Sequence, residues 1–124
     1  DSDIVAYLPI ERILFGGDLL YKGRLPWLGD AYTSDWIETL KKLKNFDAGI
    51  YVPGHGGVGN ISILFMFKQY LADLQLEVRK YIKKGKTIDE TKKEVSLPKY
   101  KTWLKYKEWL PLNVEKIYRE LTGK

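Results

Sequence analysis

Apolar and polar residues alternate along this chain in patterns that predict a mixed α and β structure. Two short β-branched and apolar runs, residues 4–8 and 12–15, are separated by a connection that begins at Pro9, and together they predict a hairpin. A third run, residues 50–52, predicts a short buried strand between a helical pattern and a glycine-rich loop. The strands and helices together predict an α+β fold class.

Four helical segments are predicted from apolar residues three and four positions apart. Ser34 or Asp35 is expected to cap the first, and the longest runs from about 60 to 84, where Gly85 ends it. Thr87 through Glu90 forms a capping-box pattern that opens a short charged helix to about residue 95, and a last helix is expected after Pro111. The predicted apolar faces of the first, longest and last helices are Trp36, Ile37, Leu40, Leu43; Leu64, Phe67, Leu71, Leu74, Val78, Tyr81; and Val114, Ile117, Tyr118, Leu121.

Two glycine-rich segments each follow an apolar run and each carry one potential metal ligand. Phe15-Gly16-Gly17-Asp18 places Asp18 where a strand gives way to an apolar loop over residues 19–21. Pro53-Gly54-His55-Gly56-Gly57 places His55 just past a strand end, where open sheets tend to bind ligands. Taken alone, the Gly-Gly-Asp segment favours a structural turn that Asp18 caps, and a single histidine in a glycine-rich loop is ambiguous. Together they indicate a candidate metal site.

The amino-acid composition excludes several classes of protein and of functional site. The 124 residues suffice for one domain with a packed core, and 44% of them are hydrophobic. Cysteine is absent, which excludes disulfides, thiolate zinc sites and a cysteine nucleophile. No apolar run approaches the ~20 residues that a bilayer requires, and no basic segment precedes an apolar one at the N-terminus. We therefore expect a cytoplasmic protein with no membrane partner.

Positive charge is concentrated in the second half of the chain. Residues 1–60 hold six Lys or Arg and eight Asp or Glu, a net charge of −2, whereas residues 61–124 hold fifteen and eight, a net charge of +7. Interleaved lysine and glutamate are typical of a solvated helical surface. The alternative is a non-catalytic basic helical module over residues 79–119, whose lysines and aromatic residues bind nucleic acid or a protein partner. That alternative predicts binding that weakens steeply with salt.

The paired glycine-rich segments, with the elements between them, resemble the C-terminal half of the metallo-β-lactamase superfamily of metal-dependent hydrolases. The likeness covers roughly residues 4–60: the strand pair ending at Asp18, the loop with Gly23, Arg24 and Pro26, the helix over 36–43, and the segment from Asp47 to Gly56. The tail around Trp109 to Val114 looks like the helical extension that some members carry. The resemblance implies a four-layer αβ/βα sandwich, of which this chain is the C-terminal half with a helical extension.

The resemblance also implies a dinuclear centre, usually of zinc. Asp18 matches the aspartate that bridges the two metals, and His55 matches the last histidine ligand of the second. These two residues are the expected catalytic and metal-binding residues, and metal-bound water is the expected nucleophile toward a carbonyl or phosphoryl centre of a small-molecule substrate. Tyr21, Lys22 and Arg24 follow the aspartate, and Tyr21 and Arg24 are candidates for substrate binding.

The sequence departs from the family pattern at the remaining ligands. Members carry an N-terminal His-x-His-x-Asp-His motif and another histidine before the bridging aspartate, and neither occurs here. Asp3, Asp30 or Asp47 could supplement the pair, although no spacing favours them. We therefore expect residues 1–84 to be the C-terminal half of a metallo-hydrolase domain, with residues 85–124 as a helical extension packed on it. Such a fragment is expected to bind zinc weakly, to be inactive alone, and to associate with its missing N-terminal half or with itself.

Overall fold

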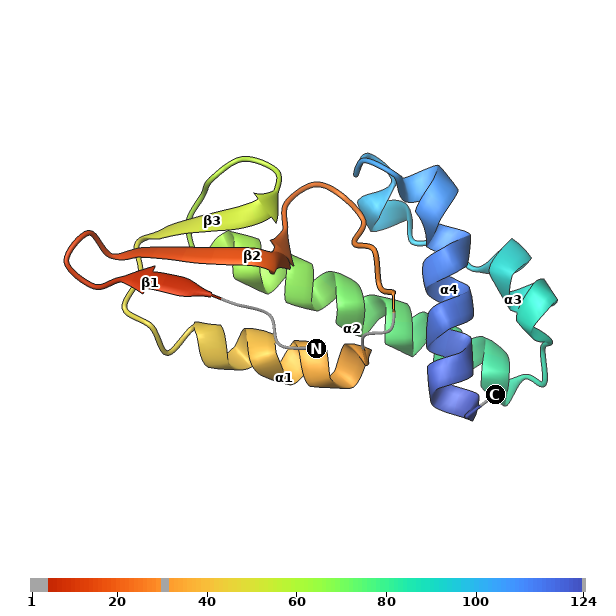
Figure 1. Cartoon of the computed structure of the whole chain (residues 1–124). Coiled ribbons are helices and arrows are strands. Elements are labelled where there is room, and N and C mark those ends of the chain that lie inside the picture. The colour runs from red at the N-terminus through yellow and green to blue at the C-terminus, as the bar shows by residue number, and fades with distance from the viewer. Residues whose placement is uncertain (1–4, 30–31, 124) are drawn as a thin grey trace.

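A three-stranded sheet lies on one side of the molecule and helices cover one of its faces (Figure 1). The structure is a computed structural model that describes residues 5–29 and 32–123. β1 (Ala6–Leu8) pairs antiparallel with the start of β2 (Ile13–Tyr21), and β2 pairs in parallel with β3 (Ile50–His55). The predicted hairpin and the α+β class are confirmed.

β2 continues through the glycine pair, and the prediction of a loop over residues 19–21 is wrong. The register of β2 against β3 shifts between Phe15 and Gly17 and again between Gly17 and Tyr21. Gly17 has a φ of 53°, which a glycine adopts without the cost that a Cβ atom imposes, so the strand bulges and then resumes pairing. β3 likewise continues beyond residue 52, and His55 is its last residue.

α1 (Thr33–Leu43) and α2 (Ser62–Lys83) lie together against the covered face of the sheet (Figure 1). Leu14 of β2 and Tyr51 of β3 are fully buried beneath them. The Trp36 indole Nε1–H donates to the carbonyl oxygen of Leu19 at 3.1 Å, which ties α1 to the sheet. The predicted apolar stripes are largely confirmed, with these side chains buried: Trp36, Leu40, Leu43, Leu64, Phe67, Leu71, Leu74 and Val78.

The N-terminus of α1 is capped from a distant part of the chain, so the prediction of a cap by Ser34 or Asp35 is wrong. Tyr32 occupies the N-cap position and makes no side-chain cap bond. Instead the Thr33 backbone N–H donates to Glu120 Oε1 at 2.7 Å, and the Thr33 hydroxyl donates to Glu120 Oε2. A carboxylate at this end also opposes the positive end of the helix dipole.

The C-terminal third forms α3 (Ile88–Glu94), the short 3₁₀ helix η1 (Pro98–Tyr100) and α4 (Tyr106–Thr122). The capping box of Thr87 and Glu90 is confirmed in both directions. The expectation that the last helix starts after Pro111 is wrong, because Pro111 lies inside α4. Proline removes one backbone bond there, and the burial of Leu110, Val114 and Ile117 in the common core offsets that loss.

α4 packs against both α2 and α3, so the C-terminal third shares a hydrophobic core with the rest of the chain. The proposed boundary between a domain over 1–84 and an extension over 85–124 stays a prediction. No helix in the described part of the chain has the length and hydrophobicity to cross a membrane.

Candidate metal centre

Asp18 and His55 lie close together near the ends of β2 and β3. Asp18 follows the bulge in β2 and His55 closes β3, and the parallel pairing of the two strands brings both residues to the same end of the sheet. Asp18 Oδ1 lies 3.6 Å from His55 Nε2. The side chain of Asp18 is 75% exposed and that of His55 is 37% exposed, so both reach solvent. The sequence therefore predicted a pair of residues that the fold does bring together.

Glycine at position 54 allows the two strands to approach closely at the site. A Cβ atom on Gly54 would lie 2.6 Å from the carbonyl oxygen of Gly17 and 3.0 Å from Asp18 Oδ1. Real Cβ atoms do not come so near a backbone oxygen, so any side chain here would push β2 away. The residue after the histidine is equally constrained, because Gly56 has a φ of 101° and faces the Lys22 carbonyl.

His55 is held on two sides by neighbours from β2 and the loop that follows it. The buried ring of Tyr21 stacks on the imidazole, with 4.9 Å between centroids and an interplanar angle of 18°. Arg24 Nη1 lies 3.0 Å from His55 Nδ1. Because a guanidinium can only donate, Nδ1 accepts this bond, and the proton of a neutral ring is then on Nε2, facing Asp18.

Arg24 connects the site to the C-terminal part of the chain. Its guanidinium carbon lies 5.0 Å from the ring centroid of Trp109, a cation–π distance. The backbone beside it is held by two bonds to Leu104, from Leu25 N to the Leu104 oxygen at 3.0 Å and from Leu104 N to the Gly23 oxygen at 2.9 Å. Among the described residues, buried Arg24 Nε has no hydrogen-bond partner. The contacts of the guanidinium with Trp109 and His55 therefore hold this side chain in place.

The carboxylates considered as additional ligands do not join the pair. Asp47 precedes β3, at the opposite end of that strand from His55, and forms an ion pair with Arg12 at 2.8 Å. Asp3 and Asp30 lie outside the described residues. Within the described ranges no group of three or more His, Cys, Asp or Glu side chains is arranged to hold a metal ion. The candidate centre therefore consists of two ligands.

The geometry of the pair fits a single divalent cation as two of its ligands. Zinc bonds to carboxylate oxygen and imidazole nitrogen are about 2.0–2.2 Å long, which places two tetrahedral ligands about 3.3–3.5 Å apart. The observed 3.6 Å between Oδ1 and Nε2 is close to that separation. A catalytic zinc uses about three protein ligands and a water molecule, so the pair fits as part of a site.

Part of the chain is similar in sequence to known proteins. Residues 1–55 match the family model described as the metallo-beta-lactamase superfamily. A metallo-beta-lactamase type 2 from Bacteroides fragilis is 40% identical over 73 residues, which are 55% of this chain and 29% of that protein. The chain belongs to the metallo-β-lactamase superfamily. A linear primary-alkylsulfatase from Pseudomonas sp. (strain ATCC 19151) is 30% identical over 108 residues, which are 78% of this chain and 20% of that protein.

Solved structures of metallo-β-lactamases share the fold over about half of the chain. VMB-1 superposes with a TM-score of 0.52 at 36% identity, covering 56% of this chain and 34% of that one. The metallo-β-lactamase of Pontibacter korlensis gives a TM-score of 0.52 at 33% identity, covering 55% and 34%. The chain thus spans less than a third of the curated relatives and about a third of these structures. The relatives place it in a family of metal-dependent hydrolases.

The roles assigned to Asp18, His55, Tyr21 and Arg24 within this metallo-β-lactamase fold stay predictions. The structure brings all four to one place and adds Trp109, which sequence reasoning did not connect with the site. The aromatic-rich stretch around Trp109 was visible in the sequence. Trp109 contacts Arg24 although the two residues are 85 positions apart in the sequence. No local sequence pattern predicts such a contact.

Proposed function

We propose that this chain supplies Asp18 and His55 to a dinuclear zinc centre of a metallo-hydrolase, whose other ligands come from an N-terminal half of the fold. The observation that carries the proposal is the 3.6 Å approach of Asp18 to His55 across two parallel strands. Membership of the superfamily supports it. Two ligands bind a zinc ion weakly, so the chain alone has little metal and no activity.

Each residue of the site has a separate task in this proposal. Bound zinc supplies Lewis acidity, which polarises a carbonyl or phosphoryl oxygen and lowers the pKa of coordinated water. Asp18 contributes negative charge, and Tyr21 fixes the plane of the His55 ring by stacking. A cation held at His55 Nε2 would require the ring proton on Nδ1, and Nδ1 would then no longer accept from Arg24. The Arg24 guanidinium would in that case be available to bind an anionic group of the substrate.

The proposal predicts different zinc contents for the chain alone and for the completed fold. After gel filtration in metal-free buffer, the isolated chain is expected to retain well below one equivalent of zinc by atomic absorption. Co-expression with a polypeptide that carries the His-x-His-x-Asp-His ligands is expected to raise this to about two equivalents, because a catalytic zinc needs about three protein ligands. Hydrolytic activity is expected only in the second sample.

Three substitutions in the completed protein distinguish ligands from other polar residues. Asp18→Ala and His55→Ala are each expected to lower zinc affinity by roughly 10–100-fold or more. Asp47→Ala is the matched control, since it removes an exposed carboxylate at the far end of β3. Full zinc loading of the isolated chain, or unchanged zinc content in both ligand variants, would contradict the proposal.

One face of the sheet is not covered by α1 and α2. This exposed face supports the proposal that an N-terminal half completes the fold. Side chains that alternate with buried Leu14 and Tyr51 point away from α1 and α2, and the strand register aligns them in rows. Phe15 is 40% exposed and Ile50 is 43% exposed, which is unusual for large apolar side chains in a sheet. We propose that the N-terminal half packs on this face in the complete protein. When the chain is alone, a second copy of the chain packs there instead. The face consists of Ala6, Leu8, Ile13, Phe15, Ile50 and Val52.

The isolated chain is therefore expected to self-associate through this face. Light scattering coupled to size-exclusion chromatography is expected to show dimers or larger species whose fraction rises with concentration. Phe15→Lys places a charge in the middle of the face and is expected to shift the population to monomer. Leu112→Lys is the control, because Leu112 is 47% exposed on α4, away from the sheet. A stable wild-type monomer at high concentration would refute self-association.

A further inference from the structure

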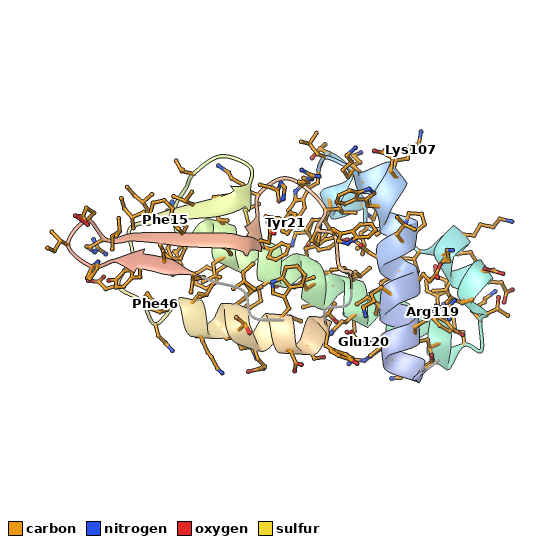
Figure 2. All side chains as sticks on the ribbon, in the orientation of Figure 1. Phe15, Tyr21, Phe46, Lys107, Arg119 and Glu120 are labelled. Atoms are coloured by element: carbon orange, nitrogen blue, oxygen red, sulfur yellow. The ribbon has the colours of Figure 1, made fainter. Side chains whose placement is uncertain are left out.

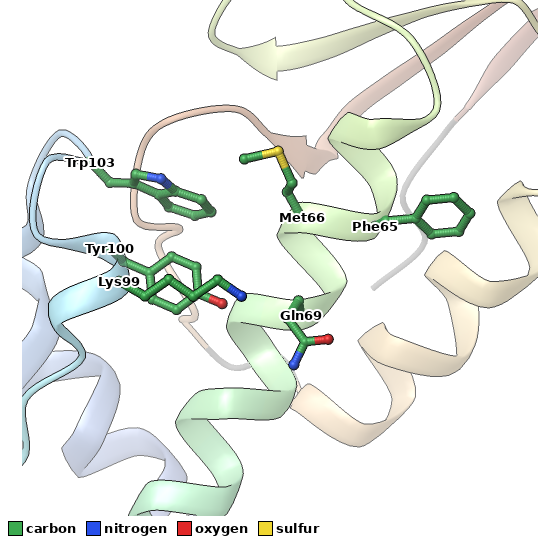
Figure 3. Close-up of a pocket in the computed structure, with 6 residues that line it drawn as sticks. All are labelled: Phe65, Met66, Gln69, Lys99, Tyr100 and Trp103. Carbon is green, nitrogen blue, oxygen red and sulfur yellow. The ribbon is translucent and has the colours of Figure 1, made fainter.

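A groove runs along α2 on the side that faces η1 and the segment after it (Figure 3). Met66 extends from α2 toward the indole of Trp103, and these two side chains border both of two adjoining cavities, of about 300 and 270 Å³. Met66 is 54% exposed and Phe65 is 44% exposed, so apolar surface remains open to solvent. The part of the groove far from the metal centre is bordered by Phe65, Met66, Gln69, Lys99, Tyr100 and Trp103.

The near end of the groove carries an uncompensated positive charge. Lys22 borders the second cavity, and its ammonium group donates to the carbonyl oxygen of Val58 at 3.3 Å. No carboxylate in the described part of the chain forms an ion pair with Lys22. At the far end Lys99 lies 4.0 Å from the Asp73 carboxylate, which balances its charge. The groove is therefore lined mainly by apolar side chains, and its unbalanced positive charge lies at one end.

That cationic end adjoins the candidate metal centre. The backbone N–H of Lys22 donates to the carbonyl oxygen of His55 at 3.0 Å. Tyr21, which borders the same cavity, stacks on the His55 ring. A molecule whose polar end meets Lys22 thus has its other end directed along α2, away from the strands.

We infer that the groove binds a linear apolar chain with an anionic head group, the head at Lys22 and the chain across Met66 and Trp103 toward Tyr100. The inference rests on the proposed function and deepens it, because it names amphiphilic anions as the substrate class. An apolar tail gains affinity from the exposed thioether and indole surface. An anionic head compensates the charge of Lys22, whereas a cationic head is repelled by it.

The single methionine of the chain provides a direct reporter of occupancy. Protein labelled with ¹³C-methyl methionine gives one methyl signal, that of Met66, which we follow during titration with hexanoate, octanoate and decanoate below their aggregation limits. The titrations contain a chelator, so binding is measured without metal. We expect a saturable shift, with affinity rising up to about fourfold for each added methylene.

Head-group and lysine controls separate this site from general detergent-like binding. Decyltrimethylammonium has the same tail and the opposite charge and is expected to bind more weakly than decanoate. Lys22→Gln is expected to weaken decanoate binding about three- to fivefold, and Lys41→Gln, an exposed lysine on α1, to leave it unchanged. The absence of a saturable Met66 shift, equal affinity for both head groups, or equal effects of the two lysine substitutions would overturn the inference. Because these readouts need no metal, their failure is distinct from a failure of the zinc measurements.

Discussion

Replacement of Gly54 by alanine is expected to destabilise the fold and to separate the two candidate metal ligands. The added methyl group would meet the Gly17 carbonyl oxygen at 2.6 Å and the Asp18 carboxylate at 3.0 Å. Neither the bulged backbone of β2 nor the paired strand β3 can yield without losing pairing, so the clash is relieved by moving the strands apart. Overpacking of this kind costs about 1–3 kcal/mol, measured as the change in the free energy of unfolding by urea titration.

The same substitution is expected to lower metal affinity in the completed protein. A shift of Asp18 relative to His55 changes the separation of Oδ1 and Nε2 from the 3.6 Å that suits one cation. Displacing a supporting contact typically costs roughly 10–100-fold in metal affinity.

Gly57→Ala is the matched control for Gly54→Ala. It lies three residues further along, just after β3. A Cβ atom there has no neighbour within 4 Å among the described residues, and its φ is outside the left-handed region. It is expected to leave both stability and zinc affinity near the wild-type values. Equal effects of the two substitutions would show that the close approach of the strands at Gly54 has no special importance for the site.

The sequence analysis predicted the helices and caps that depend on residues close together in the chain. α2 is long and its apolar residues recur with a clear helical period. Both of its ends lie within two residues of the predicted positions. The capping box of α3 involves residues three positions apart, so it was visible in the sequence. The two metal ligands were found because each sits in a glycine-rich segment after an apolar run, and the superfamily pairs those segments.

Features that depend on distant parts of the chain escaped the sequence analysis. The extent of β2 beyond Asp18 depends on a bulge that lets Tyr21 pair with His55, which no local pattern of residues 16–21 requires. Burial of Leu19 and Leu20 likewise follows from α1 and α2 covering that strand end. The contact of Arg24 with Trp109 joins a loop to a helix 85 positions later. In each case tertiary packing determines what the local sequence leaves open.

Replacement of Glu120 by alanine is expected to destabilise the protein by about 2–4 kcal/mol, because it removes a cap that joins three helices. Glu120, on α4, lies beside the start of α1 (Figure 2). Its carboxylate accepts the backbone N–H and the hydroxyl of Thr33, a fully buried residue, and Gln75 of α2 donates to that hydroxyl at 2.6 Å. Without the carboxylate, the buried Thr33 N–H and hydroxyl proton have no acceptor.

Glu120→Gln tests whether the hydrogen bonds or the charge provide this stability. The amide oxygen can still accept the Thr33 N–H, but the amide N–H₂ cannot accept the Thr33 hydroxyl proton. A smaller loss of about 1–2 kcal/mol is therefore expected, from that hydroxyl and from the missing charge at the helix N-terminus. Glu38→Ala removes an exposed carboxylate that pairs with Lys41 within α1 and is expected to cost less than about 0.5 kcal/mol. Unfolding by urea, followed by circular dichroism, measures all three. Similar losses for Glu120→Ala and Glu38→Ala would show that α1 does not depend on α4 for its cap, and that the C-terminal helix stabilises the sheet layer through apolar burial alone.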